Sequence, residues 1–189
     1  MAKKAESTLI NMLLSLTIIA VVAGAVLALV SNITAEPIAQ AEQAKMQNAI
    51  MQVLPEFDHL GEPKDVDGFI CNYAYTADDQ LVGVAVNAES QNGFGGPLGV
   101  MVGFDPDGNI TGYQVLKTSE TPGLGAKAGE WFQATGKGNV IGKNPGSNNI
   151  KVKKDGGEVD AISGSTITSR AFCDAIDIAY NVFSKGGIE

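Results

Sequence analysis

The sequence predicts an α+β protein in which one N-terminal transmembrane helix precedes a small domain of antiparallel sheet with packed helices. Three patterns carry this prediction. Residues 9–30 form an uncharged and mostly apolar run. Residues 69–116 contain short runs with strand-like alternation, separated by turn residues. Residues 166–184 carry a wide apolar stripe at helical spacing. A chain of 189 residues is long enough for one such domain and its anchor.

The first predicted element is a membrane-spanning helix. Residues 9–30 are 22 residues without a charge, and at about 1.5 Å per residue they extend over about 33 Å, enough to cross a bilayer core. The alternatives are a buried core helix and a cleaved signal peptide. Core helices of this length usually carry charges, and residues 33–35 (Ile-Thr-Ala) form a poor cleavage site. We therefore expect a retained single-pass anchor.

Charges on either side of this helix predict its orientation. Lys3 and Lys4 precede it, and Glu36 is the first charge after it, so the positive-inside rule places the N-terminus in the cytoplasm. Residues 1–32 are then a cytoplasmic stub and transmembrane helix, and the rest lies outside. The whole chain carries −8 and the first 30 residues carry +1, so the outer part carries −9. This acidity argues against nucleic acid as a partner.

Residues 33–55 are predicted to form a linking helix. Pro37 suits the first position of a helix, and apolar residues recur at helical spacing up to Pro55. The pattern does not distinguish a rigid stalk from the ordinary first helix of a domain. Residues 56–189 are then the domain itself.

Within the domain, alternating apolar residues predict four strands, and two further segments predict helices. The turn residues Asp78-Asp79 and the segment 105–108 (Asp-Pro-Asp-Gly) separate neighbouring strands. Residues 136–149 are rich in glycine and asparagine and predict a loop. The expected strands are residues 69–75, 81–86, 98–104 and 110–116, and the expected helices are residues 126–134 and 166–184.

The composition excludes several kinds of site. One histidine and two distant cysteines, Cys71 and Cys173, are too few for a zinc finger, a Cys-x-x-Cys redox pair or an iron–sulfur cluster held by this chain alone. Cys71 lies in a strand pattern and is expected to pack in the core. With His59 as the single histidine, a Ser–His or Cys–His hydrolase is not expected. The sequence offers no catalytic acid, base or metal-ligand set.

Two other segments favour ligand binding. Residues 119–125 read Ser-Glu-Thr-Pro-Gly-Leu-Gly, a backbone that can lie flat against a planar ligand because proline and glycine replace bulky side chains. Residues 160–166 read Asp-Ala-Ile-Ser-Gly-Ser-Thr and place hydroxyls at the start of the last helix, where phosphate binds well. Taken singly, the first is better explained as a plain turn and the second as an ordinary helix cap.

Taken together, and behind a single membrane helix, the two segments resemble a known family. They are similar to the FMN-binding G subunit of the Rnf electron-transport complex, whose relative is the C subunit of the sodium-pumping NADH:quinone reductase. The segment 93–97 (Gly-Phe-Gly-Gly-Pro) and the Asp-Gly turn with its following strand belong to the same resemblance. The chain lacks extra segments expected of the quinone-reductase relative, so the Rnf protein is favoured. The resemblance implies that the small domain binds FMN.

In that family, FMN is joined through its phosphate to the last threonine of the motif Asp-x-x-Ser/Thr-Gly-Ala-Thr. The resemblance therefore implies a phosphoester at Thr166, with Thr168 as a second possible acceptor. Asp160, Ser163 and Gly164 match the motif, and Ser165 replaces its alanine. Residues implied to lie along the isoalloxazine ring are Glu120, Thr121, Leu124 and Gly125, with Lys127 and Trp131 as further candidates.

The resemblance also implies partners and a location. The complex passes electrons between ferredoxin and NAD and moves sodium ions or protons, so membrane and iron–sulfur subunits of the Rnf complex are expected, together with membrane lipid. A separate flavin transferase that uses FAD and magnesium attaches the FMN. The chain is then an electron relay in the bacterial inner membrane, with the FMN domain on its outer, periplasmic side. The basic residues Lys151, Lys153, Lys154 and Arg170 are candidates to offset the acidic charge near the cofactor.

Three alternatives stay open. The chain could be a membrane-tethered FMN-binding electron donor or regulator outside the Rnf complex. It could be the equivalent component of the sodium-pumping NADH:quinone reductase. It could also be a structural protein of the complex with an unmodified Ser-Gly-Ser-Thr turn.

Overall fold

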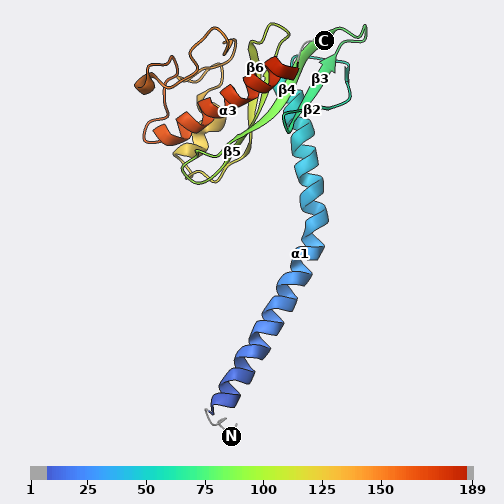
Figure 1. The fold of residues 1–189 in the computed structure, drawn as a ribbon, viewed down its shortest axis with the longest axis vertical. Helices are drawn as coiled ribbons and strands as arrows, with labels where there is room; N and C mark the ends of the chain where they lie inside the picture. The colour runs from blue at the N-terminus through green and yellow to red at the C-terminus, as the bar shows by residue number, and fades with distance from the viewer. Residues whose placement is uncertain (1–7, 187–189) are drawn as a thin grey trace. The chain divides into compact units, whose positions relative to one another are not determined.

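The computed structural model describes residues 8–186, which fall into two compact units with their boundary between residues 44 and 45. Helix α1 (Leu9–Val53) contributes residues to both units. The remaining elements belong to the second unit (Figure 1). Lys3 and Lys4, whose charges predict the membrane orientation, lie outside the described residues.

Helix α1 is continuous where two helices were predicted. Pro37, predicted as the first residue of a linking helix, lies inside α1. A proline within a helix removes the hydrogen bond to the carbonyl four residues earlier and crowds that carbonyl, but α1 continues through Pro37, and residues 31–36 carry no further helix breaker. The apolar window of α1 is long enough to cross a membrane, and none of it is buried. This exposure argues against a core helix of this chain and supports a membrane anchor.

The second unit contains an antiparallel sheet with the strand order β1-β3-β4-β5-β6 and with β2 paired to β3 (Figure 1). Strands β3 and β5 have the predicted bounds, β6 is one residue longer, and β4 continues past its predicted end to Ser90. The short strands β1 and β2 were not predicted. The strands are β1 (His59–Leu60), β2 (Lys64–Val66), β3 (Phe69–Tyr75), β4 (Leu81–Ser90), β5 (Leu98–Phe104) and β6 (Ile110–Lys117).

The remaining helices follow the sheet in the chain. The predicted helix 126–134 is present only as the 3₁₀ turn η1 (Gly125–Lys127) and the single turn α2 (Ala128–Trp131). A further 3₁₀ turn, η2 (Lys153–Asp155), was not predicted. The last helix, α3 (Thr166–Gly186), begins where the sequence places it and lies along the sheet (Figure 1).

The sheet is covered on both faces, and strand alternation decides which residues face which layer. Val84, Val86, Val100 and Val102 face α3, in a core that includes Phe172. Residues at the intervening positions form a second core with the last turns of α1. Its buried members are Ala49, Ile50, Val53, Leu54, Ala74, Ala85 and Met101. Because both faces are covered, every residue of β5 is buried.

Two glycines allow α1 to approach the sheet closely. A Cβ atom at Gly103 would lie 2.2 Å from the Val53 carbonyl oxygen, and one at Gly112 would lie 2.8 Å from the Val53 Cα. The hydroxyl of Thr111 donates a hydrogen bond of 2.6 Å to that same carbonyl. The end of α1 is therefore built into the domain.

We expect Gly103→Ala to destabilise the domain by about 3 kcal/mol, because the new methyl group would overlap the backbone at Val53. The measurement is the thermal unfolding midpoint of the full-length protein in detergent. Gly129→Ala is the matched control, since a Cβ at Gly129 meets no atom within 4 Å. Equal midpoints for the two variants would contradict the tight contact.

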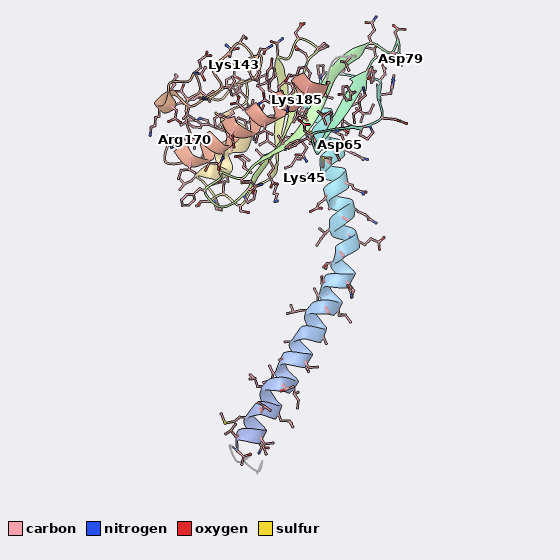
Figure 2. The ribbon with its side chains drawn as sticks, viewed as in Figure 1. Lys45, Asp65, Asp79, Lys143, Arg170 and Lys185 are labelled. Atoms are coloured by element: carbon pink, nitrogen blue, oxygen red, sulfur yellow. The ribbon has the colours of Figure 1, made fainter. Side chains whose placement is uncertain are left out.

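Ion pairs fix both ends of α3. Near its first turn, Arg170 binds the Asp155 carboxylate through Nε and Nη2, each at 2.7 Å. Near its last turn, Lys185 pairs with Asp67 at 2.6 Å. Figure 2 shows Arg170 and Lys185 at opposite ends of the helix. The first pair holds η2 against the start of α3, which is where the candidate site lies.

Candidate functional site

The two segments singled out in the sequence meet at one cavity of about 400 Å³. Residues 120–125 reach it from the loop that follows β6, and residues 164–168 reach it from the start of α3. Phe94 comes from the loop between β4 and β5, and Lys154 comes from the turn η2. The cavity is lined by Phe94, Glu120, Thr121, Leu124, Gly125, Lys154, Gly164, Ser165, Thr166, Ile167 and Thr168.

Two predicted site residues of the 160–166 segment are not among those that line the cavity. Ser163 is exposed in the turn before α3, and Asp160 forms an ion pair of 2.8 Å with Lys153. The Asp160 carbonyl accepts a hydrogen bond from the Trp131 indole at 2.8 Å. Trp131 thus stabilises the 160–166 segment from outside the cavity. Neither Trp131 nor Lys127 lines the cavity. The other residues predicted from the two segments line it, and of the four basic candidates only Lys154 does.

Glu120 connects its own loop to the loop between β4 and β5 and to helix α3. Its Oε1 accepts hydrogen bonds from the backbone N–H groups of Phe94, at 2.8 Å, and Gly95, at 3.4 Å. Its Oε2 accepts the hydroxyl of Thr168 at 2.8 Å. The carboxylate is buried and lies against Gly125, where a Cβ would come within 2.6 Å of Oε2. The side chain expected beside the ring therefore holds the walls of the cavity together.

The three hydroxyls at the start of α3 differ in accessibility. Thr168 is 1% exposed, and its hydroxyl is already bonded to Glu120. Ser165 is 9% exposed, and its carbonyl accepts two hydrogen bonds from Ser169. Thr166 is half-buried, lines the cavity and accepts a 3.4 Å hydrogen bond from the ammonium group of Lys154. Of the three, Thr166 has the hydroxyl that an incoming group can reach most readily.

Exposed apolar side chains surround the same cavity. Phe94 is 69% exposed, Leu124 45% and Ile167 47%, and large apolar groups left in water often mark a binding surface. Sequence reasoning named Leu124 but missed Phe94 and Ile167. The signal for Phe94 was present, since an aromatic residue inside Gly-Phe-Gly-Gly-Pro has few neighbours that could bury it.

These features fit FMN. The apolar side chains suit a planar aromatic ring, and a cavity of about 400 Å³ lies within the usual range for small-molecule sites. The first helical hydrogen bond of α3 is donated by Ser169 to Ser165, so the N–H groups of residues 166–168 precede the helical ladder and favour an anion. Gly164 has φ +77°, which permits the tight turn in front of the helix.

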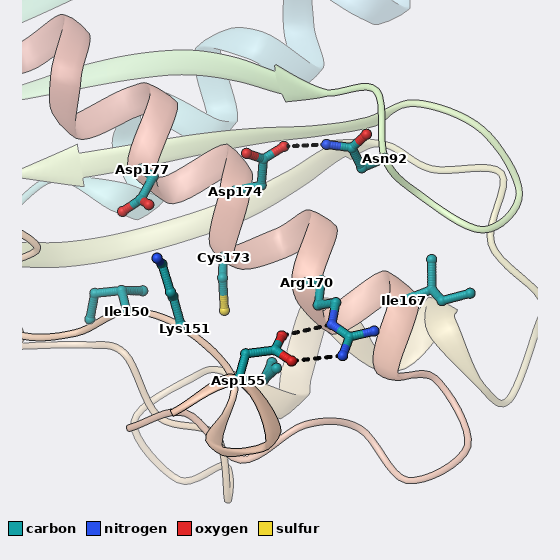
Figure 3. Close-up of a pocket in the computed structure, with 10 residues that line it drawn as sticks. Asn92, Ile150, Lys151, Asp155, Ile167, Arg170, Cys173, Asp174 and Asp177 are labelled. Carbon is teal, nitrogen blue, oxygen red and sulfur yellow. Dashed lines mark hydrogen bonds and ion pairs between the residues drawn. The ribbon is translucent and has the colours of Figure 1, made fainter. Parts of the chain in front are cut away.

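A second cavity, of about 450 Å³, lies along the neighbouring side of α3 and shares Ile167 with the first. Figure 3 shows Cys173 and Asp177 on the α3 side of it and Lys151 on the facing loop. Burial raises the pKa of the Cys173 thiol to about 12 and that of Cys71 to about 11. Both cysteines are therefore neutral at pH 7 and serve as packing residues, as expected for Cys71.

Two protein families match the chain. The profile of the FMN-binding domain matches residues 93–181, which include the whole cavity, and the profile of the RnfG N-terminal region matches residues 10–53. The chain is 33% identical over 191 residues to the G subunit of the Na(+)-translocating ferredoxin:NAD(+) oxidoreductase complex of Acetobacterium woodii, with 91% of this chain and 90% of the relative covered.

Bacteria with ion-translocating oxidoreductase complexes provide further relatives. The chain is 32% identical to the G subunit of such a complex from Vibrio vulnificus, with 86% of this chain and 83% of the relative covered. It is 30% identical to the corresponding protein from Shewanella baltica, with 90% and 87% covered. The similarity extends through the apolar helix and the domain alike.

Proposed function

The chain belongs to the family of G subunits of ion-translocating oxidoreductase complexes, and we propose that it carries FMN on Thr166 as an electron relay of such a complex. The observation that carries the proposal is the meeting of the Thr166 hydroxyl with exposed apolar side chains at one cavity. A purely structural role would not explain why Phe94, Leu124 and Ile167 are exposed around this cavity.

Bound FMN supplies the redox chemistry, since flavins exchange one or two electrons. The protein contributes binding and orientation. Phe94, Leu124 and Ile167 would hold the apolar part of the ring, and the backbone around Gly125 leaves room for a close approach. Glu120 keeps these walls at fixed positions through its three hydrogen bonds. The N-terminal end of α3 offers N–H groups to the phosphate.

Attachment requires a group transfer at Thr166. Thr166 Oγ1 would form the new P–O bond to the FMN phosphorus of FAD, with AMP as the leaving group. The hydroxyl proton would pass to a base of the separate flavin transferase. Ser163 and Gly164 are exposed beside Thr166, so the transferase can reach this hydroxyl without unfolding the domain.

The proposed topology is a single pass through the bacterial inner membrane, with residues 1–32 as cytoplasmic stub and transmembrane helix and residues 33–55 as the link. Residues 56–189, with the FMN, then lie on the outer, periplasmic side. The apolar window of α1 supports this anchor. The proposed partners are the membrane and iron–sulfur subunits of the complex, the flavin transferase and membrane lipid.

Peptide mass spectrometry tests the attachment directly. Trypsin cleaves after Lys154 and Arg170, which releases residues 155–170 with Thr166 inside. In protein purified from its native membrane, we expect this peptide to be heavier by one FMN minus one water. A peptide with the mass of the bare sequence would overturn the covalent link. Co-purification of iron–sulfur subunits would separate the complex from the alternative of an isolated tethered flavoprotein.

The anchor should be essential for electron transfer within the complex. We expect a soluble fragment of residues 33–189 not to restore ferredoxin-dependent NAD reduction to membranes that lack this protein, because it has no means of staying near its partners. The full-length protein reconstituted into the same membranes is the control. Full activity with the fragment would show that the membrane helix is dispensable.

A further inference from the structure

The turn η2 contacts the 160–166 segment and α3 through three consecutive residues. Lys153 pairs with Asp160 at 2.8 Å, Lys154 donates to the Thr166 hydroxyl at 3.4 Å, and Asp155 binds Arg170 at 2.7 Å. We propose that Lys154 is the cation that binds the flavin phosphate at Thr166, both during attachment and in the finished phosphodiester. This inference rests on the proposed function and adds a phosphate-binding residue to it.

Two of these contacts give η2 a fixed position. The Arg170 guanidinium holds both oxygens of Asp155, as the paired dashed lines in Figure 3 show. Such a two-point contact restricts orientation more than a single hydrogen bond does. Lys153 ties the other side of the turn to Asp160, six residues before Thr166. The residue between them is thereby directed at the start of α3.

Lys154 differs from its neighbours in what it contacts. Lys153 and Arg170 each face a carboxylate, whereas the hydrogen-bond partner of Lys154 is an uncharged hydroxyl. Among the described residues, none forms an ion pair with Lys154 within 4.0 Å. The neighbouring Asp155 carboxylate is hydrogen-bonded to Arg170, and Lys154 acts on it only by charge attraction without an ion-pair contact. Lys154 also lines the cavity that holds Thr166. Its positive charge is available to an anion placed there.

A phosphate on Thr166 would be that anion. The attached phosphodiester carries one negative charge, and an ammonium group near the ester oxygen can bond its free oxygens. During transfer, charge also develops on the phosphoryl oxygens, where a positioned cation lowers the barrier. Local attraction matters here because the whole chain carries −8, which repels flavin nucleotides at long range.

The first test is the rate of flavin attachment to flavin-free, full-length protein by purified flavin transferase with FAD and Mg²⁺, followed by intact mass. We expect Lys154→Gln to slow attachment about fivefold and Lys154→Glu more than about tenfold, and Lys154→Arg to restore most of the rate. The losses should shrink in high salt. Lys151→Gln is the matched control, since it removes the same charge from a residue that lines the second cavity only.

The second test asks whether Lys154 contacts the attached phosphate. An amine-acylating reagent is applied to flavin-loaded and flavin-free protein, and modification of Lys154 and Lys151 is measured by peptide mass. We expect loading to lower the reactivity of Lys154 several-fold and to leave Lys151 unchanged. Thermal midpoints of the flavin-free variants should be equal, because Lys154 is exposed and makes one weak contact.

Equal attachment rates for Lys154→Glu and wild type, or equal acylation of Lys154 with and without flavin, would overturn the inference. Failure of the proposed function looks different, because wild-type protein itself would then remain without flavin.

Discussion

We expect Thr166→Ala to abolish covalent flavin, so that the variant gives no fluorescent band on a denaturing gel and its mass equals the bare polypeptide. This is the largest effect that we expect from any single substitution. The variant lacks the oxygen proposed to form the phosphoester, and the adjacent hydroxyls of Ser165 and Thr168 are buried. The fold should persist, since Thr166 is half-buried at the first position of α3 and changes there usually cost less than about 1 kcal/mol.

Ser165→Ala is the matched control for this substitution. It removes the adjacent hydroxyl and creates the family motif with alanine, so we expect full flavin attachment. A fluorescent Thr166→Ala protein together with a dark Ser165→Ala protein would show that the acceptor is Ser165. Fluorescence in both variants would indicate Thr168 as the acceptor, whose hydroxyl would first have to break its hydrogen bond to Glu120.

Glu120→Ala should destabilise the domain by about 3 kcal/mol, because the backbone N–H groups of Phe94 and Gly95 and the hydroxyl of Thr168 lose their shared acceptor. For a chain of this size, that corresponds to a fall of about 6 to 12 °C in the thermal midpoint. We also expect weaker protection of the flavin from solvent quenchers, since the cavity walls are no longer tied together. Thermal unfolding and flavin fluorescence of the full-length protein measure the two effects.

Glu120→Gln separates hydrogen bonding from charge. The amide keeps one oxygen for the N–H groups of Phe94 and Gly95, and the Thr168 hydroxyl can turn to accept from the amide nitrogen. We therefore expect Glu120→Gln to retain most of the stability that Glu120→Ala loses. An unchanged midpoint for Glu120→Ala would contradict the bracing role. Equal losses for both variants would assign the effect to the negative charge instead.

Strands with a simple pattern were predictable from sequence, and elements defined by tertiary contacts were not. Strand β5 is a continuous apolar run because helices cover both faces of the sheet, so its bounds were found correctly. Strands β1 and β2 have two and three residues, too few to show a period. The prediction that a new helix begins at Pro37 was wrong, because Pro37 lies inside the continuous helix α1. The preference of proline for the first turn of a helix is only statistical.

The candidate site was predictable where it depends on short motifs. The sequence alone singles out residues 119–125 and 160–166, and the structure brings Gly125 and Thr166 to one cavity. The role of Glu120 could not be predicted, because its partner Thr168 lies 48 positions away in the chain. Lys154 was considered only as one of several basic residues, since the turn that directs it has no sequence signature.

The contact of Val53 with Gly103 and Gly112 has a consequence for biogenesis. On the proposed topology, the final turns of α1 emerge from the translocation machinery first and wait for β5 and β6 to arrive. Until then, Ile50 and Val53 expose apolar surface that chaperones of the outer compartment could recognise. Thr166 arrives later still, so a maturation enzyme that needs the assembled pocket would modify only chains whose secretion is almost finished.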